Sequence, residues 1–311
     1  MSIGPKTILS AATTVGWRGF ASLCLYQLGQ FVVLGIAWYA LIPASCGAHP
    51  RAFIWARMVR DASSELLPFS HLGGIVLGAR TAIAQGVPQS VAFGSIVVDI
   101  TTEMLAQVVF TTAGVVILLT STPHNSAAFS VTRSVDFGLM SIIVSCGAFV
   151  VFQRYGEALT AKLALRLFPN ARPVTQSVLN CVREVYRRPA KVGLAVFFHC
   201  AGWLASALST WIALVLMGVH ARVWPVLAIE SLVCAVRSAA FWMPNGLGVQ
   251  EAAYAAIAPL FGIGAEIGLA ISLLKRARDI AVGIPILLLW QLSAGRRILQ
   301  INGGAADQRM Q

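Results

Sequence analysis

The stretch 241–251, FWMPNGLGVQE, places a proline, an asparagine, two glycines and a glutamate between two apolar runs. Turn-forming residues at this density break a helix. The next helix is expected to begin near Val249, so Glu251 falls in its first turn, where an acidic side chain satisfies free backbone N–H groups. The stretch therefore predicts the tip of a broken helical hairpin.

The residues around this tip have the composition of a membrane protein. The 311 residues are 57% hydrophobic and 11% charged, against about 25% charged in a typical soluble domain. The mean hydropathy is +0.76. Several apolar runs, the first at about 20–42, reach the roughly 20 residues needed to cross a bilayer. We expect an all-α, multi-pass integral membrane protein with a single domain over residues 1–311.

The net charge of +11 fits basic loops on the cytoplasmic face of a membrane, and the sequence contains no nucleic-acid-binding motif. The longest polar stretch, 153–191, holds eight Lys and Arg residues against Glu157 and Glu184. Apolar residues recur at helical spacing over about 174–186, which predicts an amphipathic helix on the membrane surface. The segment 153–191 is therefore expected to be cytoplasmic.

The sequence points to no metal site, disulfide framework or cofactor. Its six cysteines are scattered without CxxC spacing, and its five histidines do not cluster. The hydrolytic motifs GxSxG and HExxH are not present.

Two parts of the chain, 176 residues apart, show the same features in the same order. Each has an arm, a Pro/Gly break, a short arm, and a long helix with charged residues near its middle. They cover about 51–120 and about 223–293. The matched positions are Pro68 with Pro244, Gly86 with Gly262, Asp99 with Lys275, and Glu103 with Asp279. With 153–191 cytoplasmic, the two copies cross the membrane in opposite senses. Inverted repeats with interrupted helices are typical of transporters, which predicts a site between two re-entrant hairpins.

Charged side chains occur at membrane depth, where each unpaired charge costs several kcal/mol. Asp99 and Glu103 lie four residues apart and share a helix face. By pseudo-symmetry we expect them to face the cations of the other long helix, Lys275, Arg276 and Arg278. Structural ion pairs that pin the helices are the alternative for any single residue, whereas the whole set favours a substrate or proton route.

Three groups of candidate site residues follow. Donors for a lipid headgroup are Arg80, Arg237, Arg276, Arg278, Asn245, Gly246 and Gly248. Residues for charge balance or a proton relay are Glu65, Asp99, Glu103, Glu251, Lys275 and Asp279. The hairpin breaks are Pro68, Gly73, Gly74 and Pro244. For Glu251, a capping role and a role in holding a cationic group or a proton remain open alternatives.

Three motifs, SSELLPFSHLGG followed by GAR, SIVVDITTEMLAQ, and PNGLGVQEAAY, together resemble the HpnL-like membrane proteins associated with hopanoid biosynthesis. These belong to the family of lysylphosphatidylglycerol synthase transmembrane regions. The resemblance covers most of residues 50–290. Asn245 departs from the PGGLG or PGALG turn usual in the family. The resemblance implies a lipid-handling bundle, which in the larger relatives is a flippase for aminoacylated phospholipid beside a separate synthase domain.

Three functions are weighed on this basis. The first is a lipid transporter or flippase of the bacterial inner membrane, which handles a hopanoid or an anionic or zwitterionic phospholipid. The second is an accessory protein that binds hopanoid-biosynthesis enzymes through the basic 153–191 surface. The third is an intramembrane lipid-modifying enzyme. Because the chain closes with a short polar tail soon after its last expected span, at 266–290, we expect no synthase domain and no enzymatic activity.

Overall fold

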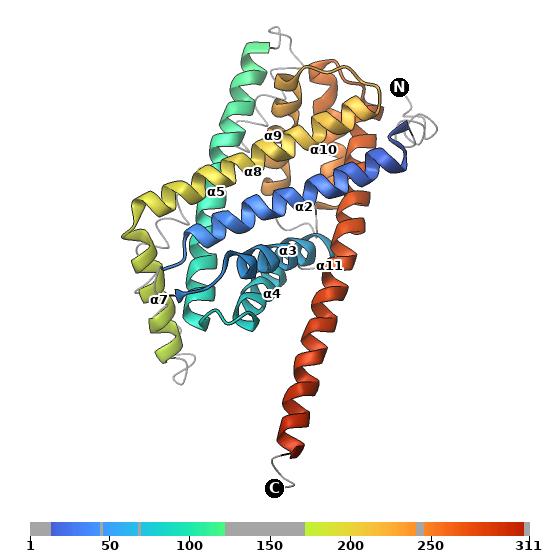
Figure 1. Cartoon of the computed structure of the whole chain (residues 1–311). Helices are drawn as coiled ribbons and strands as arrows, with labels where there is room; N and C mark the ends of the chain where they lie inside the picture. Colours follow the sequence, from blue (N-terminus) through green and yellow to red (C-terminus); the bar gives the residue numbers. More distant parts are fainter. Residues whose placement is uncertain (1–13, 44–45, 68–69, 122–171, 241–245, 308–311) are drawn as a thin grey trace.

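The computed structural model describes residues 14–43, 46–67, 70–121, 172–240 and 246–307, and these residues form helices and no strand. The helices are α2 (Gly16–Ala40), α3 (Pro50–Leu66), α4 (Ser70–Ala84), α5 (Gln89–Ser121), α7 (Arg172–Tyr186), α8 (Pro189–Leu216), α9 (Val223–Ala239), α10 (Val249–Ile257), the short 3₁₀ helix η4 (Ala258–Phe261) and α11 (Ala265–Asp307). Figure 1 shows their arrangement.

The helices α2, α5 and α8 are long and apolar enough to cross a membrane. This confirms the prediction of an all-α membrane protein. The sequence also predicts a span in the apolar run at about 135–152, which lies outside the described residues.

The helix boundaries repeat at the same offset that relates Pro68 to Pro244 in the sequence. This offset carries the last residue of α2, Ala40, onto the last residue of α8, Leu216, and the first residue of α5, Gln89, onto the first residue of α11, Ala265. The helix α3 corresponds to α9, and α4 corresponds to α10 with η4. Each repeat therefore contains four elements and includes a long first helix, α2 or α8, that the sequence comparison left out.

Corresponding helices run in opposite directions. The Tyr26 hydroxyl donates to the carbonyl of Ala205 at 2.9 Å, and the Gln30 side chain donates to the carbonyl of Gly202 at 3.0 Å. Residue numbers rise along α2 where they fall along α8, so the two helices pack antiparallel. In Figure 1, α5 and α11 also run in opposite senses along the molecule. The repeats are inverted relative to each other.

The two repeats interlock, because the arm of each packs against the long helix of the other. The helix α3 lies against α11, and α9 lies against α5. Two glycines allow this close approach. A Cβ on Gly114 of α5 would lie 1.6 Å from the Ser231 hydroxyl oxygen on α9, and a Cβ on Gly283 of α11 would lie 2.7 Å from Leu66 on α3. Each of the helix pairs α3–α11 and α5–α9 therefore takes one helix from each repeat.

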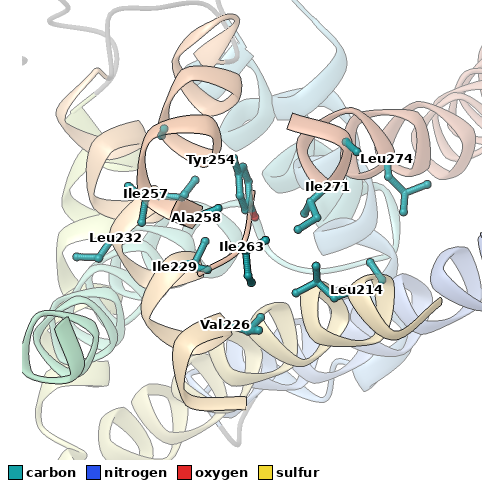
Figure 2. Packing of buried hydrophobic residues seen from close by; sticks show 14 of the residues in the cluster. Leu214, Val226, Ile229, Leu232, Tyr254, Ile257, Ala258, Ile263, Ile271 and Leu274 are labelled. Atoms are coloured by element: carbon teal, nitrogen blue, oxygen red, sulfur yellow. The ribbon is translucent and has the colours of Figure 1, made fainter. Parts of the chain in front are cut away.

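The second hairpin is held in place by an apolar cluster, shown in Figure 2. Tyr254 and Ile257 of α10 pack with Ile229 of α9 and Ile271 of α11. These side chains are at most 4% exposed. The absence of a side chain at Gly268 brings α11 close to α10, since a Cβ there would lie 2.5 Å from the Tyr254 carbonyl oxygen. Close packing of this kind stabilises the hairpin by van der Waals contact, because lipid tails are as apolar as these side chains and supply no hydrophobic driving force between helices.

The helix α7 is amphipathic as predicted, and part of its apolar face packs against protein. Cys181 and Val185 are buried against protein, in a cluster with Leu41 and Val98. Gly94 of α5 makes room for Cys181, since a Cβ there would lie 2.7 Å from the Cys181 Cβ. The alternation of polar and apolar residues predicts a buried face but does not identify what covers it.

Candidate functional site

A cavity of about 860 Å³ lies between the two repeats. Side chains from α2, α3, α5, α8, α9, α10 and α11 line it. The lining contains five cations and five carboxylates, namely Arg57, Arg60, Arg237, Lys275 and Arg278 with Asp61, Glu65, Glu103, Glu230 and Asp279. The charges of the lining therefore balance when every group is ionised.

The first wall of the cavity is an ion-pair network between α3 and α5. Arg57 donates to Asp61 at 2.8 Å, to Asp99 at 3.2 Å and to Glu103 at 2.6 Å. Arg60 donates to Asp99 at 2.6 Å and to Glu103 at 2.8 Å. Arg57 and Arg60 lie three residues apart on one face of α3, so both guanidinium groups reach the same two acids.

His199 of α8 contacts this network on the side of Asp99 that faces away from the cavity. Its Nε2 lies 3.0 Å from Asp99 Oδ1, and the two side chains are 1% and 0% exposed. We call the six residues the α3–α5 network: Arg57, Arg60, Asp61, Asp99, Glu103 and His199. Asp61 and Glu103 face the cavity, whereas Asp99 and His199 are buried behind them.

The second wall is built around Glu230 of α9. Its carboxylate accepts hydrogen bonds from the Ser206 hydroxyl at 2.7 Å and the Thr210 hydroxyl at 2.8 Å. It also accepts from the Tyr254 hydroxyl and from the Lys275 ammonium, which in turn lies 3.0 Å from the Tyr254 oxygen. Four helices, α8 to α11, thus converge on one buried carboxylate. We call these five residues the Glu230 cluster.

The ion pair between Arg237 and Glu65 joins the two repeats across the cavity. Arg237, near the end of α9, donates to Glu65, near the end of α3, at 3.2 Å. Each of these side chains is 32% exposed, whereas the other four lining cations are 3–12% exposed. The Arg237–Glu65 pair is therefore the more accessible part of the charged lining.

Glu251 caps the helix α10 at the tip of the second hairpin. Gly246 and Gly248 have φ angles of +56° and +79°, which favour glycine. The helix begins at Val249, as predicted, and Glu251 accepts the Gly248 N–H at 2.9 Å. Arg276 donates to Glu251 and to the Gly246 carbonyl, the latter at 3.1 Å. Glu251 therefore caps this helix and pairs with Arg276, which is the first of the two roles considered for it.

The charge pairing expected between the two long helices is wrong. Asp99 and Glu103 bind Arg57 and Arg60 of α3, not the cations of α11. On α11, Lys275 binds Glu230, Arg276 binds Glu251, and Arg278 binds Asp279 at 2.8 Å and Ser209 at 3.0 Å. The arm helix α3 supplies the cations for the acids of α5, and the arm helix α9 supplies Glu230 for Lys275 of α11.

Other sequence candidates are distributed as follows. Glu65, Arg237, Gly246, Lys275, Arg278 and Asp279 line the cavity with Glu103, whereas Gly248, Glu251 and Arg276 lie at the hairpin tip. Arg80 is exposed on α4 and does not line the cavity. Pro68, Pro244 and Asn245 fall outside the described residues.

Gly73 and Gly74 are not hairpin breaks as predicted. Both lie inside the continuous helix α4, which begins at Ser70. Gly74 instead permits contact with α3, because a Cβ there would lie 2.7 Å from the Arg60 carbonyl oxygen.

Sequence reasoning missed several residues of the site. Arg57, Arg60 and Asp61 are the strongest omission, and their three- and four-residue spacing in an otherwise apolar arm was the available signal. Glu230 and His199 are single polar residues inside apolar runs, which marks them for attention but does not identify their partners.

Comparison with known proteins identifies the family of the chain. No curated protein and no solved structure matches the chain significantly. The family model described as the lysylphosphatidylglycerol synthase TM region matches residues 2–286, which is nearly the whole chain. The HpnL-like subgroup is not distinguished by this match. The chain therefore belongs to the lysylphosphatidylglycerol synthase TM region family, whose description indicates a membrane role connected with lipids.

Proposed function

We propose that this protein is a lipid transporter of the flippase type, which takes a polar headgroup into the cavity between its two inverted repeats. The observation that carries the proposal is the charge-lined cavity of about 860 Å³ at the interface of the repeats. A charged cavity between inverted repeats is how transporters present a site near the middle of the membrane. Membership of a lipid-related family supports a lipid as the cargo.

Arg237 is the side chain best placed to bind an anionic or polyol headgroup. The guanidinium group has five N–H donors. Within the described part of the chain, Arg237 uses Nη2 for Glu65 and makes no second ion pair. Arg57, Arg60 and Arg278 each bind two or more side chains and are 3–10% exposed. Arg237 therefore has donors available and an accessible position.

Glu65 fits a complementary role. Its carboxylate faces the cavity beside Arg237, so an entering headgroup exchanges one ionic partner for another and does not leave a buried charge alone. This arrangement suits a phospholipid headgroup with both a phosphate and a cationic group. A hopanoid polyol is the second cargo consistent with the family, since its hydroxyl groups can donate to Glu65 and accept from Arg237.

The test is lipid exchange by the full chain in proteoliposomes. The distribution of fluorescent phosphatidylglycerol between the two leaflets is followed by chemical quenching of the outer leaflet. Wild type is compared with two variants that each remove one arginine, Arg237→Ala and Arg80→Ala. A charge-assisted hydrogen bond contributes about 1.5–3 kcal/mol, so we expect Arg237→Ala to slow exchange roughly 10–100-fold. Arg80→Ala should match wild type, because Arg80 is outside the cavity.

Equal exchange rates in wild type and Arg237→Ala would refute this assignment of the headgroup site. An unlabelled hopanoid polyol added as competitor identifies the cargo: inhibition favours the polyol, and unchanged exchange favours the phospholipid. The proposal includes a location in the bacterial inner membrane and a role without covalent chemistry on the lipid.

A further inference from the structure

The charges of the α3–α5 network do not balance. It joins two cations, Arg57 and Arg60, to three carboxylates, Asp61, Asp99 and Glu103. By contrast, the described pairs Arg237–Glu65, Lys275–Glu230, Arg276–Glu251 and Arg278–Asp279 each match one cation with one anion. With all three carboxyl groups ionised and His199 neutral, the network therefore carries one excess negative charge in a site where uncompensated charge is costly. One bound proton would make it neutral.

The geometry of His199 indicates that this proton is not on the imidazole. His199 Nε2 lies 3.0 Å from Asp99, and Nδ1 is buried without a hydrogen-bond partner among the described residues. A neutral ring that donates through Nε2 leaves only an acceptor unused at Nδ1. A charged ring would bury an N–H donor without a partner, which is the more costly arrangement. The proton therefore belongs on a carboxyl group.

Asp61 is the carboxyl group best suited to hold it. Asp99 lies within hydrogen-bonding distance of three donors, from Arg57, Arg60 and His199, and Glu103 likewise accepts from Arg57 twice and Arg60 once. Among the described residues, Asp61 accepts one hydrogen bond, from Arg57 Nε at 2.8 Å. Each hydrogen bond to a carboxylate favours its ionised form. Asp61 also lines the cavity and is 20% exposed, so its proton can exchange with water there.

We propose that the α3–α5 network binds one exchangeable proton on Asp61, and that this proton couples the protein to a proton gradient. In the protonated state the network is neutral. When Asp61 releases its proton to water in the cavity, the carboxyl becomes a carboxylate and the network gains one negative charge beside the headgroup site. The coupling rests on the proposed transport function, whereas the proton site itself does not.

The charged groups of the α3–α5 network and of the cavity lining all enter the expected pH response, and His199 of α8 is one of them. Arg57, Arg60 and Glu65 lie with Asp61 on α3, Asp99 and Glu103 lie on α5, Glu230 and Arg237 lie on α9, and Lys275, Arg278 and Asp279 lie on α11, with Cys234 and Tyr254 as the remaining titratable groups of the lining.

The first experiment measures the proton directly, without lipid transport. The purified full chain is titrated from about pH 5 to about pH 9, across the range in which an ordinary aspartate is ionised throughout, and the infrared band of protonated carboxyl groups is followed. We expect wild type to lose one carboxyl band as the pH rises and Asp61→Asn to lack it. Glu184→Gln, which removes an exposed carboxylate on α7, should keep it.

A wild-type spectrum without such a band, or a band unchanged in Asp61→Asn, would overturn the proposal. If Asp61→Asn does not fold, Asp61→Glu serves in its place, because the carboxyl is kept and its band should shift in frequency. An unshifted band in that variant also overturns the assignment.

The second experiment tests coupling in proteoliposomes with fluorescent phosphatidylglycerol. A gradient of one pH unit is a tenfold ratio of proton concentration, equivalent to 1.36 kcal/mol, so it should change the exchange rate of wild type by up to about tenfold. Exchange by Asp61→Asn should not respond. Exchange that is insensitive to the gradient in wild type refutes the coupling. A carboxyl band in a wild type that moves no lipid supports the proton site and refutes the proposed transport function.

Discussion

The Glu230 cluster gives a sharp prediction for Lys275→Met. Methionine keeps a long side chain of similar volume but removes the ammonium group. Glu230 is 7% exposed and would keep its three hydroxyl donors, Ser206, Thr210 and Tyr254, but would lose its only cation in the described cluster. Removing one partner of a buried ion pair costs about 3–5 kcal/mol, because the other charge remains buried. We expect a loss of this size in the free energy of unfolding.

The double variant distinguishes electrostatics from packing. Glu230→Gln alone leaves the Lys275 ammonium buried without its anion and should cost a similar amount. Together, Lys275→Met and Glu230→Gln leave neutral groups that can still form hydrogen bonds, so the double variant should lose far less than the sum of the two singles. The coupling free energy is expected to be about 3 kcal/mol, at the upper end of values measured for residues in contact.

The assay is thermal unfolding in detergent, monitored by tryptophan fluorescence. At about 2–4 °C per kcal/mol for chains of this size class, Lys275→Met should lower Tm by about 10 °C. Lys191→Met removes an exposed ammonium at the start of α8 and serves as the control, with Tm within about 2 °C of wild type. Additive losses in the double variant, or a Lys275→Met protein as stable as wild type, would refute this account of the cluster.

Two further predictions concern helix packing. Burial raises the pKa of the Cys181 thiol to about 11, so at pH 8 its thiolate fraction is about 100-fold below that of a thiol at the ordinary value of 9.0. Maleimide labelling of a variant that retains only Cys181 should therefore be at least about 100-fold slower than labelling of a peptide thiol, and should accelerate about tenfold per pH unit until about pH 11. Labelling at the peptide rate would show that α7 leaves α5. Gly114→Ala should lower the free energy of unfolding by about 1–3 kcal/mol, because the added Cβ would lie 1.6 Å from the Ser231 hydroxyl oxygen. Gly193→Ala is the control, since its Cβ would meet nothing within 4 Å, and a Gly114→Ala protein no less stable than this control would contradict the close packing of α5 on α9.

The sequence predicted features that depend on local chemistry or on order along the chain. The break before Val249 follows from Gly246 and Gly248, whose left-handed backbone few other residues adopt. The constant offset between the repeats was readable because both place charged residues and breaks in the same order. These properties require no knowledge of which helices touch.

Partner choice was not predictable, because it depends on the packing of the two repeats. Asp99 and Lys275 occupy equivalent positions, and pseudo-symmetry alone suggested that they meet. In the structure each is bound instead by the arm helix of its own repeat, through Arg57 and Arg60 or through Glu230. The exposed position of Arg80 on α4 likewise depends on how the helices pack.

The interlocked packing of the repeats has a consequence for biosynthesis. The helix α3 belongs to the first quarter of the chain and leaves the ribosome long before α11, the last helix, against which it packs. When the first repeat enters the membrane, the face of α3 that packs against α11 is therefore still uncovered. It is covered only when α11 is made near the end of translation. Assembly is consequently completed only after both halves are inserted, so two half-chains produced separately should find each other and restore one bundle.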